Sequence, residues 1–283
     1  GYWSRGLGDV YKRQLVKWSE NYPVGEVLFF RGFCGLIPIL FLIPKKNYKN
    51  FYKTDRPKLH FARCMAGLMA IVSIFIALRN LPLATVVSIS FAAPIFATIM
   101  SIYFLSEKIG KYRWLAVFIG FIGVIIIAQP GISSLNLNYI YPIIFCLGMS
   151  YVAIAIRQLS TSEPVWLISF YFSIAISILG LLTVPFGWVM PTFFDFILLC
   201  MIGLLGGVAN LLLGQSYKLS EVSLVSPLKY LSLVFAIFFG YFVWNEIPSY
   251  KTLIGAALVI LSSIIIFRRE IYLKKPNLIF KNE

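Results

Sequence analysis

Charged residues are scarce in this sequence. Asp, Glu, Lys and Arg together make up 13% of its 283 residues, whereas 59% are apolar. Soluble domains carry about 25% charged residues. A chain of this length would need to coat about two domains if it were soluble, and so few charges cannot do that. The composition excludes a soluble enzyme and a disordered protein, and it predicts an integral membrane protein.

Histidine is also scarce, and paired cysteines are absent. His60 is the single histidine, and the four cysteines stand alone in apolar runs, without a CxxC or CxH pair. This excludes a disulfide scaffold and argues against a metal site. No HExxH, GxSxG or GxxxxGK[ST] pattern occurs, so neither a familiar catalytic site nor an ATP-binding loop is expected. We therefore expect no enzyme and no cofactor.

Long apolar runs separated by short loops are what the sequence does contain. A helix of about 20 residues, or roughly 17–25, crosses the hydrocarbon core of a bilayer. The runs lack the alternation of apolar and polar residues that a membrane β-barrel shows. The sequence predicts an all-α membrane protein with spans at 24–43, 61–79, 83–105, 112–128, 139–156, 164–186, 193–213, 221–244 and 251–267.

The first residues do not fit this pattern. Residues 1–14 contain several glycines and charges and cannot span a membrane, and only residues 15–18 resemble the end of a helix. One hypothesis is that a first helix is incomplete and that 1–14 are a non-native or disordered leader. The alternative is a genuine short amphipathic start.

The net charge of +14 is distributed unevenly between the predicted loops. If one helix precedes Val24, one side of the membrane holds 17 Lys and Arg residues, and the other side holds only Lys17, Arg79 and Lys251. Positive charge marks the cytoplasmic side, which predicts a cytoplasmic C-terminus and loop 45–58. Because these charges sit in loops, nucleic-acid binding is not expected. The cytoplasmic set is Lys45, Lys46, Lys49, Lys53, Arg56, Lys58, Arg63, Lys108, Lys111, Arg113, Arg157, Lys218, Arg268, Arg269, Lys274, Lys275 and Lys281.

A weak internal repeat accompanies this topology. At an offset of 139 residues, Phe96-Ala97 falls on Phe235-Ala236, and Glu107 falls on Glu246. Five spans per half is an odd number, so the two halves would insert with opposite orientations. Inverted repeats of this kind are typical of secondary transporters, whose site lies near the midplane between the repeats.

The chain resembles EamA-type members of the drug/metabolite transporter superfamily. The resemblance rests on Phe29-Phe30-Arg31, the two Glu-terminated helices, and the tail formed by Glu246-Ile247-Pro248, Gly255-Ala256-Ala257 and Arg268-Arg269-Glu270. It implies ten helices in two inverted five-helix repeats. The expected organisation is a first repeat at 15–129 with an incomplete first helix, a second at 139–268, and a basic cytoplasmic tail at 269–283.

Two basic residues, Arg31 and Lys229, lie about seven and eight residues inside predicted spans, where charge is costly unless it meets a cavity or a partner. Arg31 either binds an anionic group of a substrate, or it snorkels outward or pairs with Glu26. Lys229 lies within Ser226-Pro227-Leu228-Lys229-Tyr230, and helical spacing predicts that Ser226, Lys229 and Tyr230 occupy neighbouring parts of one face. A cavity-facing Lys229 could bind a carboxylate or phosphate or take part in proton coupling; the alternative is snorkelling.

Two further polar or aromatic side chains are candidate substrate contacts. Asn210 shares a face with Gly203, Gly207 and Gly214, and the glycines themselves predict close helix packing. Tyr151 could stack on a planar substrate, although most aromatics in such a chain face lipid. The candidate substrate-binding set is Arg31, Tyr151, Asn210, Ser226, Lys229 and Tyr230.

These observations predict a secondary transporter in the bacterial inner membrane that moves a small organic metabolite by alternating access, with efflux favoured over uptake. The alternatives are a membrane-embedded enzyme acting on lipid and a channel or structural membrane protein. Candidate partners are the metabolite, the lipid bilayer, a coupling proton or ion, and a second copy in a homodimer. Neither a metal nor nucleic acid is expected.

Overall fold

The computed structural model describes residues 22–43, 52–81, 83–128, 137–244 and 249–274, and within these ranges the chain forms helices and no strand. This confirms the all-α fold class. The elements are α2 (Val24–Phe33), α3 (Leu36–Phe41), α4 (Pro57–Asn80), α5 (Leu83–Ser90), α6 (Ala93–Leu105), α7 (Lys111–Ala128), η2 (Leu137–Tyr139), α8 (Ile140–Leu159), α9 (Val165–Leu181), η3 (Val184–Phe186), α10 (Phe193–Leu219), α11 (Val222–Val225), η4 (Ser226–Tyr230), α12 (Leu231–Trp244) and α13 (Tyr250–Lys274).

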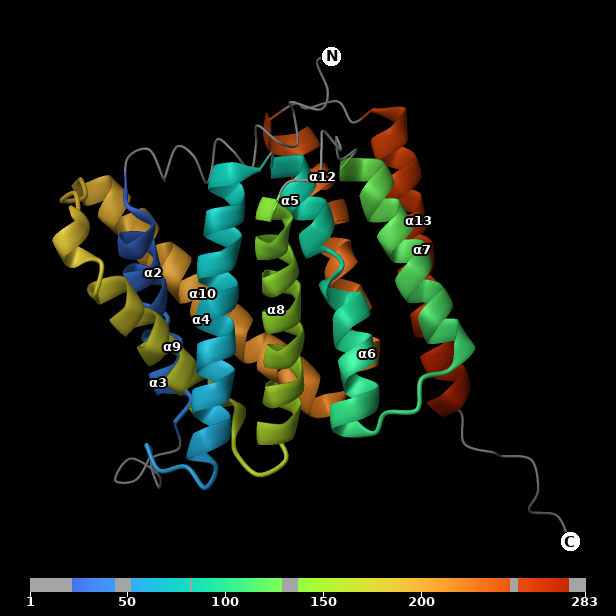
Figure 1. The fold of residues 1–283 in the computed structure, drawn as a ribbon, viewed down its shortest axis with the longest axis horizontal. Coiled ribbons are helices and arrows are strands. Elements are labelled where there is room, and N and C mark those ends of the chain that lie inside the picture. Colours follow the sequence, from blue (N-terminus) through green and yellow to red (C-terminus); the bar gives the residue numbers. More distant parts are fainter. Residues whose placement is uncertain (1–21, 44–51, 82, 129–136, 245–248, 275–283) are drawn as a thin grey trace, which may run out of the picture.

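Several helices are long and apolar enough to cross a bilayer. Within the described residues six meet that requirement: Val24–Phe41, Pro57–Asn80, Thr85–Leu105, Leu137–Leu159, Val165–Phe186 and Phe193–Leu219. Successive spans run in opposite directions, as Figure 1 shows. The chain is therefore a multi-pass membrane protein.

Each predicted span coincides with helix, but some helices extend further than predicted. The prediction placed the ends of two spans at residues 213 and 267, whereas α10 continues to Leu219 and α13 to Lys274. Polar residues such as Ser216 and Lys218 suggested a loop. An α-helix satisfies its own backbone hydrogen bonds in water as well as in lipid, so it does not have to end where the apolar run ends.

Three of the spans are interrupted. The first changes direction at Cys34–Gly35 between α2 and α3, the second at Phe91–Ala92 between α5 and α6, and the third is a 3₁₀ turn at Ser226–Tyr230. Pro227 lies in that 3₁₀ turn, where it removes one backbone donor.

The break between α5 and α6 is held by α8. The Ser150 hydroxyl donates to the Ala93 carbonyl at 2.9 Å, and the Cys146 thiol lies 3.0 Å from the Ile89 carbonyl. A break in an α-helix leaves carbonyls without their usual donors, and inside a membrane water does not replace them. The Ala92 N–H donates to the Ile89 carbonyl at 2.8 Å, and side chains of α8 add contacts to the carbonyls of Ile89 and Ala93.

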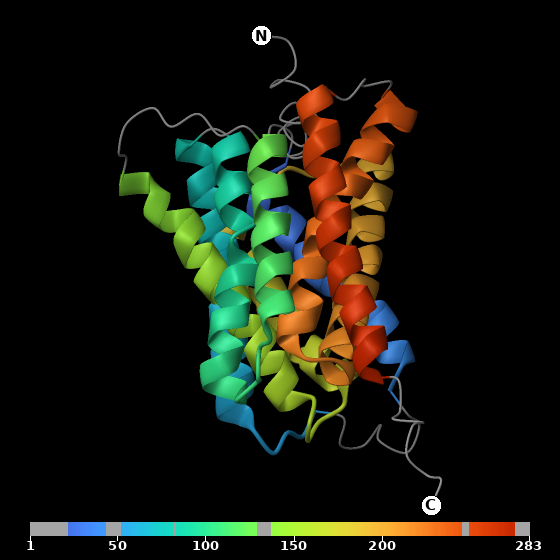
Figure 2. The ribbon, with the colours of Figure 1, turned by 90° about the vertical axis from the view of Figure 1, so that its right-hand side faces the viewer.

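Glycines allow the helices to approach closely. α7 packs along α13, α2 along α9, and α4 along α8 (Figures 1 and 2). Where α7 crosses α13, a Cβ on Gly123 would lie 2.7 Å from the Gly255 carbonyl oxygen, and a Cβ on Gly255 would lie 2.6 Å from the Gly123 carbonyl oxygen. Only glycine fits on both sides of this crossing.

One end of the molecule gathers the basic connections. The loops that follow α6, α8 and α10 lie at the same end as the start of α4 and the end of α13, and Figure 1 shows this end at the bottom. We call it the basic end, because it carries Lys108, Arg157 and Lys218. Charge and fold therefore agree on which loops share a side.

Candidate functional site

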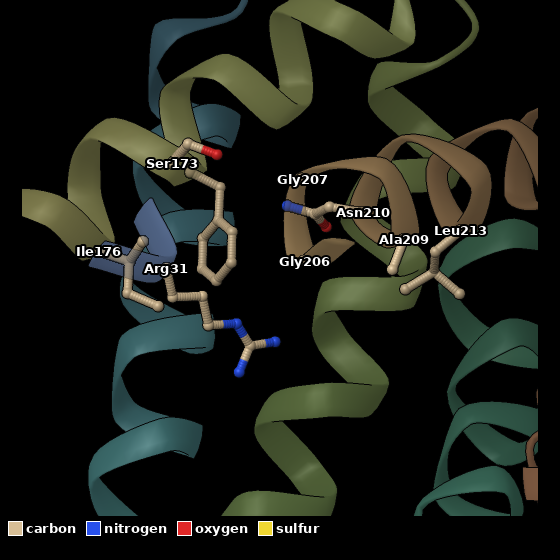
Figure 3. Close-up of a pocket in the computed structure, with 9 residues that line it drawn as sticks. Arg31, Ser173, Ile176, Gly206, Gly207, Ala209, Asn210 and Leu213 are labelled. Atoms are coloured by element: carbon tan, nitrogen blue, oxygen red, sulfur yellow. The ribbon is translucent and has the colours of Figure 1, made fainter. Parts of the chain in front are cut away.

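A small, partly open cavity lies between α2, α9 and α10. Its volume is about 130 Å³. Figure 3 shows the Arg31 side chain extending from α2 and the Asn210 amide extending from α10 toward the same space. The lining residues are Arg31, Phe172, Ser173, Ile176, Gly206, Gly207, Ala209, Asn210 and Leu213.

Glycines on α10 allow it to pack closely against the chain around Arg31. A Cβ on Gly206 would lie 3.5 Å from Cγ of Arg31, and a Cβ on Gly207 would lie 2.4 Å from the Gly35 carbonyl oxygen. Gly203 approaches the carbonyl of Phe30 in the same way, at 2.4 Å. The predicted packing role of Gly203 and Gly207 is confirmed, and it is this packing that brings Asn210 beside Arg31.

Neither Arg31 nor Asn210 makes a hydrogen bond or ion pair with any residue that the structure describes. The predicted alternative partner of Arg31, Glu26, is buried and instead accepts a hydrogen bond from the Val189 backbone N–H at 3.3 Å. The cavity thus presents a cation and an amide without a protein partner among the described residues. Such a pair suits the oxygen atoms of a carboxylate, phosphate or other polar group.

The second group of predicted site residues, Ser226, Lys229 and Tyr230, lies in the 3₁₀ turn. Tyr230 is fully buried against α7 and α13, where it packs with Val124 and Val259. Lys229 is half-buried, and its Nζ lies 5.8 Å from the centre of the Tyr217 ring on α10. The two neighbouring side chains therefore differ in burial, whereas Ser226 and Lys229, three residues apart, lie on one face of the 3₁₀ turn.

Ser226 and Tyr151 complete the predicted set. Ser226 is fully buried in the turn, and its Oγ has no hydrogen-bond partner among the described residues. Tyr151 is half-buried on α8 and meets the Phe104 ring edge-on, with the ring centres 6.3 Å apart. Neither residue lines the Arg31 cavity.

Sequence reasoning missed a buried polar contact at the basic end. The His60 Nε2 contacts the Glu163 carboxylate, which also accepts hydrogen bonds from the Thr54 hydroxyl at 2.5 Å and the Asp55 N–H at 3.0 Å. Burial opposes ionisation of Glu163, but the hydrogen bonds from His60 and Thr54 outweigh it and hold the pKa of this carboxyl below its ordinary value. A lone histidine and a loop glutamate more than 100 residues away gave no signal in the sequence.

A second polar contact at the basic end joins the two halves of the chain. The Glu107 carboxylate accepts hydrogen bonds from the N–H groups of Val222 at 2.8 Å and Ser223 at 3.1 Å, at the start of α11. Ser106 adopts the left-handed conformation, with φ of 54°, and so turns the chain toward α11. Arg113 pairs with Glu221 beside it. Glu107 therefore has a structural role at the end of α6.

Among the described residues, no group of three or more His, Cys, Asp or Glu is placed to hold a metal ion. What the structure offers is a partly open polar cavity between apolar helices, in a fold in which several spans are interrupted. This combination defines a membrane carrier for small molecules.

The comparisons with known proteins agree. The model of the EamA-like transporter family matches residues 6–129 and 137–268, and the chain belongs to this family. It is a transporter within the drug/metabolite transporter superfamily, not an enzyme.

Named bacterial relatives include an uptake protein and an exporter. The chain is 29% identical to the S-adenosylmethionine uptake transporter of Rickettsia bellii over 267 residues, which cover 94% of this chain and 90% of the relative. It is 25% identical to the pseudopaline exporter CntI of Pseudomonas aeruginosa over 257 residues, or 89% of each chain. A solved crystal structure with 14% identity shares the fold, with a TM-score of 0.75 over 96% of this chain and 97% of that one.

Proposed function

We propose that this protein is a secondary transporter that carries a small organic metabolite across the bacterial inner membrane by alternating access. The observation that carries the proposal is the cavity between α2, α9 and α10, into which Arg31 and Asn210 extend without a partner among the described residues. Placing a charged side chain inside a membrane costs free energy unless it faces a cavity or a partner, and such residues often mark the path of a substrate or ion. In this proposal Arg31 and Asn210 contact the substrate.

Two inverted repeats, residues 15–129 and 139–268, form the proposed moving halves. Two features support this division. The interrupted spans α5–α6 and α11–α12 occupy matching places in the two halves, and α7 packs on its counterpart α13 as α2 packs on α9. A helix before Val24 would complete ten spans, and it would fall among residues 1–21, outside the described residues, as does the proposed leader at 1–14.

The proposed orientation places the basic end, and with it the C-terminus, in the cytoplasm. A reporter that is active only in the cytoplasm, fused after Glu283, is expected to be active. A reporter that requires the periplasm is expected to be inactive at the same position, and the reverse pattern would overturn the orientation.

S-Adenosylmethionine is the first substrate to test, because the relatives that transport it are 28–29% identical to this chain. Purified protein in liposomes loaded with unlabelled S-adenosylmethionine is expected to accumulate the labelled compound by exchange. Uptake that saturates and is reduced by competitors indicates a carrier, whereas uptake that rises linearly with concentration indicates a channel. Related amino-acid metabolites form the rest of the panel.

The site is tested in the same vesicles. Arg31→Gln and Asn210→Ala are expected to reduce exchange at least tenfold at subsaturating substrate, because each removes a polar contact. Arg79→Gln is the matched control, because Arg79 is exposed at the end of α4 that lies away from the basic end, and this variant is expected to leave exchange unchanged. If Arg31→Gln inserts normally and exchanges at the wild-type rate, the cavity is not the substrate site.

The same assay addresses the remaining proposals. Lys229→Met tests whether the lysine over Tyr217 takes part, and a normal rate would remove it from the site. A pH gradient imposed across the liposome tests proton coupling. Accumulation in inside-out cell vesicles is expected if the protein exports its substrate, and accumulation in right-side-out vesicles would indicate uptake.

A further inference from the structure

A second arginine lies close to the cavity but outside it. Arg63, on α4, is one of the most deeply buried large side chains, with 1% of its surface exposed. Its Nε and Nη1 have no hydrogen-bond partner among the described residues. Its guanidinium carbon lies 3.8 Å from the centre of the Phe172 ring on α9.

The surroundings of Arg63 do not supply an anion. Among the described residues no carboxylate pairs with Arg63, and the buried carboxylate of Glu163 is occupied by His60, Thr54 and the backbone N–H groups of Asp55 and Arg56. A cation–π contact with Phe172 compensates for part of the lost hydration. A buried guanidinium whose N–H donors have no partner among the described residues can nonetheless bind a hydrogen-bond acceptor such as an anion.

Phe172 connects this arginine with the proposed substrate cavity. The same phenylalanine that covers Arg63 is part of the wall of the cavity that holds Arg31. Gly67 on α4 accommodates the ring, since a Cβ there would lie 2.7 Å from Cε2 of Phe172. The ring therefore contacts both α4 and the cavity.

The two arginines lie at different depths. α4 starts at the basic end, and Arg63 is in its second turn, whereas α2 starts at the opposite end and Arg31 is near its C-terminus. Arg63 is thus nearer to the basic end than Arg31. A solute that leaves the cavity past Phe172 would meet Arg63 next.

We propose that Arg31 and Arg63 bind the same anionic group of the solute in turn, and that the Phe172 ring is the gate between them. In the structure the gate is closed: Arg31 faces the cavity, and Phe172 covers Arg63. Movement of the ring exposes the Nε and Nη1 donors of Arg63 to a carboxylate or phosphate. The proposal rests on the proposed transport function and adds to it that the substrate carries an anionic group.

Cys64, the neighbour of Arg63, allows the gate to be tested without knowledge of the substrate. In a protein whose other cysteines are replaced by serine (Cys34, Cys146 and Cys200), Cys64 is a single buried thiol. The probes are two methanethiosulfonate reagents, one carrying an anionic sulfonate and one carrying a cationic trimethylammonium. Reaction rates are measured on the protein in liposomes.

We expect slow modification of Cys64 by both reagents when Phe172 is present. Phe172→Ala is expected to accelerate the anionic reagent at least tenfold and the cationic reagent much less, because Arg63 attracts the sulfonate. Ile176→Ala, which also opens the cavity wall from α9, is the matched control and is expected to have little effect. Equal acceleration of both reagents, or none, would overturn the gate.

Arg63 itself is tested in the Phe172→Ala background. Arg63→Gln is expected to abolish the preference for the anionic reagent, and Arg63→Lys, which keeps the charge, is expected to retain it and serves if the glutamine variant does not fold. Preference that survives Arg63→Gln would overturn the role of Arg63. These rates do not depend on transport, so failure of the exchange assay with normal labelling behaviour would count against the proposed substrates and not against the gate.

Discussion

The imidazole of His60 contacts the carboxylate of Glu163, and this contact fastens the start of α4 to the turn between α8 and α9. Both side chains are almost fully buried. Because the same carboxylate accepts hydrogen bonds from Thr54 and from the backbone at Asp55, the segment that leads into α4 is held as a unit. The fold at the basic end depends on a residue pair that the apolar pattern does not contain.

Removal of the charge at Glu163 should destabilise the protein. Glu163→Gln cannot accept all the hydrogen bonds of the carboxylate, and we expect a loss of about 1–3 kcal/mol, the cost of leaving buried polar groups unsatisfied. Thermal unfolding in detergent measures the change. Asp55→Asn is the matched control: its side chain is exposed and its backbone N–H still reaches Glu163. Equal melting temperatures for the wild type and Glu163→Gln would contradict the prediction.

The same pair predicts a dependence on pH. Folding lowers the pKa of Glu163 below its ordinary value of 4.5, so the unfolded state takes up a proton first as the pH falls. The stabilisation is therefore present above pH 4.5 and is lost as the pH falls through the lower pKa of the folded state. The difference in melting temperature between wild type and Glu163→Gln should shrink in that range. A difference that grows on acidification would argue against the assignment.

The crossing of α7 and α13 should not tolerate a methyl group. Gly123→Ala places a Cβ 2.7 Å from a backbone oxygen that cannot move independently, and we expect a loss of roughly 1–3 kcal/mol from overpacking. Gly110→Ala is the matched control, because nothing lies within 4 Å of a Cβ there. Thermal unfolding of both variants gives the comparison, and similar values would show that the two helices separate readily.

Glu107 should contribute through the start of α11. Glu107→Gln keeps the size of the side chain but weakens the acceptance of the Val222 and Ser223 N–H groups. We expect a cost of roughly 0.5–2 kcal/mol, the range measured for the loss of helix caps. Lys108→Gln, the adjacent surface change, is the control. Limited proteolysis near residue 221 is expected to accelerate for Glu107→Gln alone.

The support of the α5–α6 break can be tested by removing one hydroxyl. Ser150→Ala leaves the Ala93 carbonyl without its donor from α8, and we expect a loss of about 1 kcal/mol, the net value of a typical hydrogen bond. Ser216→Ala is the control, since its hydroxyl bonds only to a carbonyl of its own helix. Calorimetric or fluorescence melting curves suffice for the comparison.

The apolar runs predicted the positions of the helices well, because the bilayer sets a minimum length for each span and leaves few alternatives. The contacts of Gly203 and Gly207 with α2 and α3 were predicted for the same reason, since small residues at helical spacing have few other uses in lipid. Arg31 and Asn210 attracted attention because they are polar residues within apolar runs.

Other features depend on contacts that no local pattern encodes. Arg63 follows a basic segment, and the sequence therefore places it among the charges on the cytoplasmic side. Only the packing of α4 against α9 buries it. The different burial of Lys229 and Tyr230 depends on how the 3₁₀ turn at Pro227 packs against neighbouring helices, which helical spacing alone does not predict. The contact between His60 and Glu163 joins residues 103 positions apart, which periodicity cannot detect.

The glycine crossing of α7 and α13 has a geometric consequence for movement. Each helix presents a carbonyl oxygen to the glycine of the other, so the contact looks the same when the two helices are exchanged. Because this glycine–carbonyl contact is reciprocal, a rotation of the helices about it toward either face of the membrane starts from the same interaction. If the two halves alternate, this crossing can serve as their shared fulcrum without any contact being broken and remade.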